Sequence, residues 1–196
     1  CIIVTLETKE RQWITQTRRI LSYGTDMWKL DRLNDLSRRI CATRPSFDVI
    51  DQEYEKILKG PTYSTAMQCG IYAMTAGAFA IFFGGNLWDG IASLFVGALI
   101  RVTLYAFVKV HMKAIFSNIL CSLISGMACI LMCRVGPGQH VEMIMIGNIM
   151  LLIPGVLMTN SFRDFISGDM ISGLLHFSEA MITAVCVAVG FIFSKM

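Results

Sequence analysis

The residues best suited to chemistry close an apolar run, in the stretch LLIPGVLMTNSFRDFISGD. Proline lacks a backbone N–H group and clashes with the preceding helical turn, and glycine weakens a helix, so Pro154 and Gly155 predict a helix break. Asn160, Arg163 and Asp164 follow shortly after it. Transporters place broken helices at their binding sites, where free backbone groups meet a polar substrate. The pattern indicates a substrate gate or a subunit contact; a packing kink with two charges at the water interface is the alternative.

A second candidate is Arg101, which lies well inside an apolar segment. A charge inside a membrane is costly and usually has a partner. The guanidinium could therefore hold a substrate carboxylate. The alternatives are a structural ion pair, for which Glu179 is the expected partner, and snorkelling toward the membrane surface.

The last apolar segment carries His176 and Glu179, with Thr183 four residues further on. This spacing places the three side chains on one face of a helix. Intramembrane ionisable groups generally face away from lipid, so we predict Glu179 to be a coupling or counter-charge site with His176 beside it. A structural pair with His176 or Arg101 is the alternative. An intramembrane enzyme using His176 and Glu179 is a weaker interpretation, because no third polar partner accompanies them.

Small and polar residues also interrupt two other apolar segments. Asn118, Ser122 and Ser125 fall on one face of a predicted helix, and Gly147 and Asn148 lie in the segment after it. Such residues either line a polar cavity or hold neighbouring helices together by close packing and hydrogen bonds.

The elements that position these residues follow from composition. The chain has 196 residues, of which 55% are hydrophobic and 16% charged, whereas about a quarter of a soluble domain is charged. Residues 1–60 carry 11 Lys or Arg and 9 Asp or Glu, and residues 61–196 carry only 6 and 5. We therefore predict a polar head at 1–63 and a membrane domain at 64–196.

The head reads as a small α/β unit. CIIVTLE is β-branched and predicts a strand, RQWITQTRRIL is a weaker candidate for its hairpin partner, and Gly24 and Thr25 suggest a turn. Two helices should follow, separated by Pro45, with Ser46 as the cap of the second. Their apolar faces are Leu30, Leu33, Leu36 and Ile40, then Phe47, Ile50, Tyr54 and Ile57. Because the chain starts at Cys1, we expect the head to be incomplete at its N-terminus.

Five apolar segments make up the membrane domain. They lie near 66–84, 88–108, 114–133, 142–158 and 171–193. A spanning helix needs roughly 20 apolar residues, which the fourth reaches only by continuing past the Pro-Gly pair. The predicted fold class is a polytopic α-helical membrane protein with about five transmembrane helices and a small N-terminal cytoplasmic α/β domain.

Orientation follows from the basic residues of the connections, which favour the cytoplasmic side. The Lys- and Arg-rich head should be cytoplasmic, and the connection bearing Lys109 and Lys113 should lie on the same side. Five crossings would then leave the C-terminus outside, a mild reason to expect a second membrane subunit.

Motifs for other function classes are missing from the sequence. It contains no phosphate loop, no HExxH and no GxSxG, and its seven cysteines include no CxxC pair. We predict no enzymatic activity, cofactor or metal site, and the net charge of +3 gives no reason to expect nucleic-acid binding.

Three stretches together resemble the threonine/serine exporter (ThrE-like) family, and more closely its split branch of YjjP-like subunits. They are FFGGNLWDG at 82–90, LIPGVLMTNSFRDFISGD at 152–169 and SGLLHFSEA at 172–180, and IIVTLE, TRRI and RLNDLSRRI in the head are similar as well. The family usually has a longer N-terminal stretch.

The resemblance implies a subunit of a secondary-active exporter in the bacterial inner membrane. Its substrates would be small carboxylate-bearing metabolites, either threonine and serine or dicarboxylates such as succinate. A second, YjjB-like membrane subunit would be its partner, and the complex could also form a higher oligomer. A scaffold or regulatory subunit that does not itself transport is the alternative function.

Overall fold

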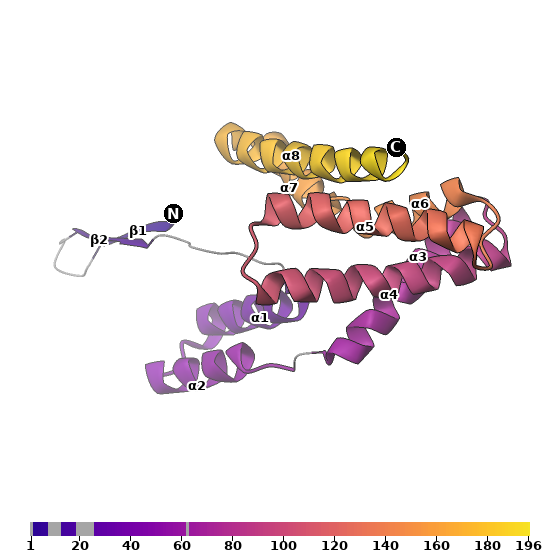
Figure 1. The fold of residues 1–196 in the computed structure, drawn as a ribbon. Coiled ribbons are helices and arrows are strands. Elements are labelled where there is room, and N and C mark those ends of the chain that lie inside the picture. Colours follow the sequence, from indigo (N-terminus) through magenta and orange to yellow (C-terminus); the bar gives the residue numbers. More distant parts are fainter. Residues whose placement is uncertain (1, 8–12, 19–25, 62) are drawn as a thin grey trace. The chain divides into compact units, whose positions relative to one another are not determined.

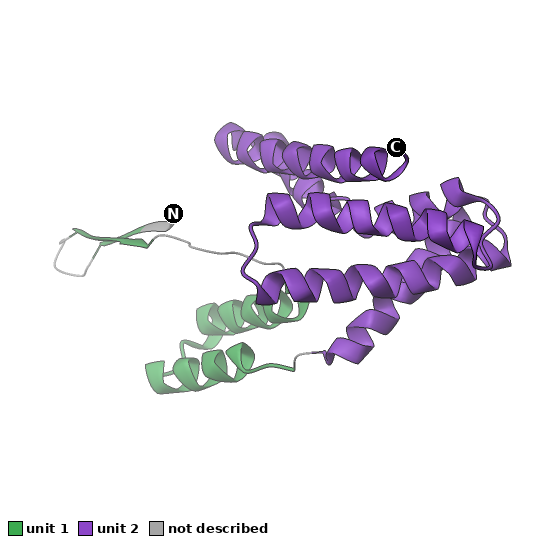
Figure 2. Ribbon diagram, viewed as in Figure 1, with its two compact units in different colours: residues 1–62 green, residues 63–196 purple. Residues whose placement is uncertain are grey.

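The chain folds into two compact units, residues 1–62 and residues 63–196 (Figures 1 and 2). The computed structural model describes residues 2–7, 13–18, 26–61 and 63–196, and within these it contains eight helices and one two-stranded sheet. The mainly helical architecture with a small N-terminal sheet confirms the predicted fold class.

The first unit starts with an antiparallel hairpin. Strand β1 (Ile2–Glu7) pairs with β2 (Trp13–Arg18), with Ile2 opposite Arg18 and Glu7 opposite Trp13. The weakly patterned second segment is therefore the partner of the first strand. The expected turn at Gly24 and Thr25 lies outside the described residues.

Two helices complete the first unit, α1 (Met27–Thr43) and α2 (Phe47–Leu58). Ser46 stands at the cap position of α2, as expected, but its hydroxyl makes no capping hydrogen bond. An ion pair between Arg39 and Glu53 joins the two helices. Of the apolar faces expected to pack, only Leu36 and Ile57 are buried, so the core of this unit is small.

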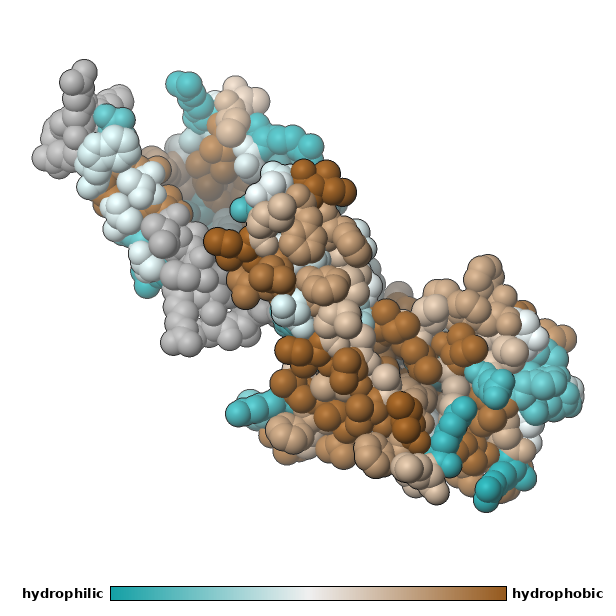
Figure 3. Space-filling model, turned by 90° about the horizontal axis from the view of Figure 1, so that it is seen from above, coloured by the Kyte–Doolittle hydropathy of each residue, from teal (hydrophilic) through white to brown (hydrophobic). Residues whose placement is uncertain are grey.

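The second unit is a bundle of apolar helices. Four are long and apolar enough to span a membrane: α3 (Thr65–Phe82), α4 (Leu87–Lys109), α5 (Ala114–Arg134) and α8 (Met170–Ser194). Hydrophobic residues dominate the visible surface of this unit, and hydrophilic side chains gather at one end of it (Figure 3). The chain is a multi-pass membrane protein.

The prediction of about five spanning helices needs one correction. The fourth segment forms two short helices, α6 (Val141–Ile149) and α7 (Gly155–Ile166), instead of one continuous span. Helix α6 has 9 residues, which is about 13 Å of helix and less than half of a bilayer core. Pro154 caps α7, and its missing N–H group and its ring keep it from continuing α6.

The short helix α6 is held by close packing against its neighbours. It contacts α3, α4 and α5, whereas α7 packs against α8, and α8 also packs against α5. A Cβ atom on Gly147 of α6 would lie 2.7 Å from the backbone oxygen of Ala76 in α3. Only glycine allows the two backbones to approach this closely, which is how membrane helices gain packing contacts.

A buried carboxylate fixes the connections at one end of this bundle. Asp89, near the start of α4, is fully buried and accepts hydrogen bonds from the backbone N–H groups of Gln139 (2.7 Å), His140 (2.8 Å) and Asn86 (3.1 Å). Its Oδ2 also lies 2.8 Å from Nδ1 of His140. The carboxylate therefore joins the α3–α4 connection to the α5–α6 connection, directly before α6 begins.

Replacing Asp89 should destabilise the membrane unit strongly. Asp89→Ala removes the acceptor for three backbone donors and one imidazole, so we expect the free energy of unfolding to fall by about 3 kcal/mol or more. The measurement is thermal unfolding of the purified protein in detergent micelles.

Asp89→Asn is the matched control. Its remaining oxygen can still accept from Gln139 and His140, while the bonds that Oδ2 receives from Asn86 and the His140 ring are lost. We expect roughly half the destabilisation. Equal melting temperatures for the alanine variant and the wild type would show that this carboxylate does not hold the connections.

Candidate functional site

Polar groups are buried beside the helix break. Asn148, one residue before the end of α6, is fully buried, and its Nδ2 donates to the backbone oxygen of Ile144 (2.8 Å) and weakly to Ser93 Oγ of α4 (3.4 Å). Among the described residues, the Asn148 Oδ1 and Ser125 Oγ atoms have no hydrogen-bond partner.

These two oxygens are unusual because buried polar atoms in folded proteins are nearly always hydrogen-bonded. They belong to α6 and α5, which pack against each other next to the break. An unpaired amide oxygen can accept a hydrogen bond from a water molecule or from a polar substrate. Asn148 and Ser125 are therefore buried residues with unused hydrogen-bonding capacity.

A second polar cluster lies on the other side of the break, between α7 and α8. Asp164 Oδ2 accepts a hydrogen bond from Ser172 Oγ at 2.9 Å and lies 2.9 Å from His176 Nδ1. An Arg163 guanidinium nitrogen is 3.7 Å from the other carboxylate oxygen. The Asp164 side chain is only 14% exposed, and that of His176 is 35% exposed.

Helical spacing brings this second cluster together. Ser172 and His176 are four residues apart on α8, so both face α7. Helix α7 is held against α8 by Ser161, whose hydroxyl donates to the backbone oxygen of Gly173 at 2.8 Å. Because a carboxylate only accepts hydrogen bonds, Nδ1 of His176 must carry the proton in this arrangement.

The electrostatics of Asp164 follow from these contacts. The hydrogen bond from Ser172 is the main reason why the pKa of Asp164 lies below its usual value, and His176 and Arg163 lower it further, against an opposing effect of partial burial. The carboxylate is therefore charged at neutral pH.

Arg101 has a different neighbour from the one expected. Its Nε donates to Gln68 Oε1 of α3 at 2.8 Å, and a second guanidinium nitrogen bonds the same oxygen. The guanidinium carbon lies 5.9 Å from the ring centres of Tyr72 and Tyr105. No carboxylate among the described residues lies within ion-pair distance of Arg101, so nothing in this part of the chain neutralises its charge.

The expected ion pair between Arg101 and Glu179 does not form. Arg101 belongs to α4 and Glu179 to α8, and both of these helices pack against α5. Glu179 is exposed, while His176, which was expected on the same face, turns toward Asp164. The expectation that Glu179 points into the bundle is therefore wrong for the chain by itself.

Two further candidate regions are the polar face of α5 and Asn160 on α7. Ser122 donates to the backbone oxygens of Asn118 (2.8 Å) and Ile119 (3.0 Å), and a Cβ atom on Gly190 of α8 would lie 1.9 Å from its hydroxyl. These contacts favour helix packing over a cavity for this face. Asn160 is half-buried on α7.

Sequence reasoning missed several residues of these clusters. Gln68 is the partner of Arg101, and its polar side chain near the start of an apolar segment was a usable signal. Ser172 was detectable from its four-residue spacing to His176. Asp89 and His140 lie 51 residues apart, and no local pattern connects them. No group of three His, Cys, Asp or Glu side chains that could hold a metal occurs within the described residues.

Comparison with known proteins adds one match. The ThrE family model, described as "Putative threonine/serine exporter", matches residues 1–196, which is the whole chain. No curated protein and no solved structure matches the chain.

The hydrogen bond from Ser172 to Asp164 predicts a pH-dependent stability difference. A lowered folded-state pKa stabilises the protein above the ordinary pKa of aspartate, about 3.9, and this contribution is lost as the pH falls through the folded-state value. We expect Ser172→Ala to lower the melting temperature at pH 7, and the gap to the wild type to close below about pH 4.

Ser178→Ala is the control for this measurement. Ser178 lies on the same helix and its hydroxyl bonds only the backbone oxygen of Leu174, at 2.8 Å. It should shift the melting temperature slightly and equally at all pH values. A gap between Ser172→Ala and the wild type that stays constant from pH 7 to pH 3 would contradict the role of this hydrogen bond.

Proposed function

Because the chain belongs to the threonine/serine exporter family ThrE, we propose that it carries small carboxylate-bearing metabolites out of the cell as part of a secondary-active exporter. Threonine and serine are the first candidates, and dicarboxylates such as succinate are the second. The observation that carries the proposal is Arg101, a cation within a spanning helix that no carboxylate of the described chain neutralises.

A carboxylate substrate would supply the missing charge. A guanidinium forms strong, charge-assisted hydrogen bonds with a carboxylate, often two in parallel. Gln68 orients the Arg101 guanidinium, and the tyrosine rings on either side give it an apolar frame. Because amino acids and dicarboxylates both carry a carboxylate, the same arrangement suits either class of substrate.

The helix break and the second polar cluster fit the remaining steps of transport. We assign gating and substrate contacts to the break at Pro154 and Gly155, with Asn148 before it and Asn160 after it. His176 and Asp164 would hold the coupling proton. Glu179 stays a candidate coupling group only if a partner or a water-filled cavity covers its side of α8.

We also propose a second, YjjB-like membrane subunit and a place in the bacterial inner membrane. The exposed Glu179 in a spanning helix supports the subunit, since a lipid-facing carboxylate is costly. The basic head supports a cytoplasmic N-terminus, and the C-terminus would lie outside.

A counterflow assay tests the function. Proteoliposomes holding the chain with its YjjB-like subunit are preloaded with serine, threonine or succinate, and entry of the labelled compound is followed. Arg101→Gln should lower the rate about 10- to 100-fold, since it removes a charged hydrogen bond to the substrate. Arg101→Lys should retain part of it because the charge remains.

Lys109→Gln is the matched control, because Lys109 is a cation at the end of the same helix. It should leave counterflow unchanged. Full activity of Arg101→Gln would contradict the proposed carboxylate site, and full activity of the chain without the second subunit would contradict the partnership. If both subunits are needed but no Arg101 variant matters, the chain is the scaffold and its partner holds the path.

The break yields a separate prediction. Pro154→Ala makes a continuous helix across 141–166 more favourable by about 3 kcal/mol, and joining the helices would hide the backbone groups exposed between them. We expect a folded protein with a lower counterflow rate.

Pro137→Ala, in the connection before α6, serves as the proline control and should leave the rate unchanged. If Pro154→Ala is expressed normally and counterflow proceeds at the wild-type rate, the break is a packing kink and has no part in transport.

A further inference from the structure

An apolar groove with a basic end runs along the surface of α5. Leu99 of α4 borders one side, and residues 194–196 at the end of α8 border the other. The volume of the groove is about 530 Å³. Its floor consists of residues from α5: Ile124, Met127, Ala128, Ile130, Leu131 and Arg134.

The length of the groove matches one leaflet of a bilayer. Ile124 lies ten residues before Arg134 on the same helix, which is about 15 Å along the axis. Half of a bilayer core of about 30 Å has the same depth. An acyl chain in this groove would therefore extend from the membrane surface to the middle of the bilayer.

Two cations stand at the surface end of the groove. Arg134 is the last residue of α5 and Lys195 follows the last residue of α8. Both side chains are exposed, and neither forms an ion pair within the described part of the chain. Basic pockets between membrane helices bind anionic lipid headgroups.

A second hollow meets the groove at the same two cations. It has a volume of about 420 Å³ and is lined by Ile130, Cys133, Arg134, Val141 and Lys195. The second hollow shares Ile130 and both cations with the groove, so it widens the basic end of the groove, where a phosphate would sit.

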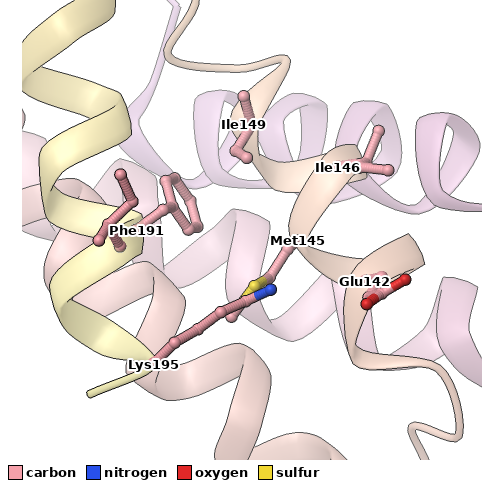
Figure 4. Close-up of a pocket in the computed structure, with 7 residues that line it drawn as sticks. Glu142, Met145, Ile146, Ile149, Phe191 and Lys195 are labelled. Carbon is pink, nitrogen blue, oxygen red and sulfur yellow. The ribbon is translucent and has the colours of Figure 1, made fainter.

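Lys195 also borders a third hollow of about 330 Å³ between α6 and α8. Figure 4 shows its side chain extending from the end of α8 toward α6, with Glu142 at the far edge. The Glu142 carboxylate disfavours an anion there, so the phosphate belongs on the Arg134 side.

We propose that Arg134 and Lys195 bind the phosphate of an anionic phospholipid that has an acyl chain in the groove on α5. This inference is independent of the proposed transport. It requires no particular substrate, coupling ion or second subunit.

The experiment compares lipids of opposite headgroup character. Purified protein is placed in nanodiscs that contain equal amounts of phosphatidylglycerol and phosphatidylcholine. After transfer to detergent, native mass spectrometry counts the molecules of each lipid that stay bound to the protein. Two cations should favour the anionic lipid about 30-fold. Arg134→Gln/Lys195→Gln should reduce this preference to about one, and melting temperatures in each lipid provide a second readout.

Two variants keep the test decisive. Lys109→Gln/Lys113→Gln removes two cations from the α4–α5 connection, at the other end of α5, and should leave the preference unchanged. Met127→Trp fills the groove and should reduce retention of both lipids without changing a charge.

Three outcomes would overturn the proposal. Equal retention of the two lipids by the wild type, or an unchanged preference in Arg134→Gln/Lys195→Gln, would show that these cations select no lipid. A dimer that Met127→Trp dissociates would show that the groove holds a second copy of the chain. If glycerol phosphate raises the melting temperature as much as phosphatidylglycerol, the site binds the phosphate alone and the groove has no role.

Discussion

One buried carboxylate determines how the membrane unit is assembled. Asp89 is withdrawn from water, so its charge is tolerable only with several hydrogen-bond donors around it. Those donors come from the start of α4 and from the residues directly before α6. The hydrogen bonds to this one carboxylate therefore join two connections that lie about fifty residues apart in the sequence. Helix α6, too short to cross a membrane by itself, takes its position from this joint and from its packing against α3.

The helix break separates two groups of helices. Before it, α6 packs among α3, α4 and α5; after it, α7 packs against α8. The chain thus leaves one group and enters the other within a few residues around Pro154. The break therefore lets the chain make both sets of contacts within a short stretch of sequence. The buried oxygens of Asn148 and Ser125 lie in the first group, and Asn148 stands one residue before the end of α6.

Local patterns predicted the elements well and the contacts between them less well. Apolar runs gave the four spanning helices nearly to the residue, and the Pro-Gly pair marked the break, because both depend on neighbouring residues. The prediction of an Arg101–Glu179 ion pair was wrong. Arg101 lies on α4 and Glu179 on α8, and the sequence alone does not show that each of these helices packs against α5. The Asp89–His140 contact escaped detection for the same reason: their proximity depends on how α3 to α6 pack. The contact between Asp164 and His176 joins two expected residues whose proximity only the α7–α8 packing reveals.

The two charged clusters belong to different helix groups, and this limits how they can communicate. Arg101 is fixed to α3 and α4 by Gln68 and two tyrosines, whereas Asp164 and His176 are fixed to α7 and α8. Helix α5 packs against α4, α6 and α8, and its contact with α8 combines the close approach of Ser122 to Gly190 with Phe191 beside Gly126. Helix α5 and the residues between Ile149 and Gly155 are therefore the parts of the membrane unit that connect the two clusters.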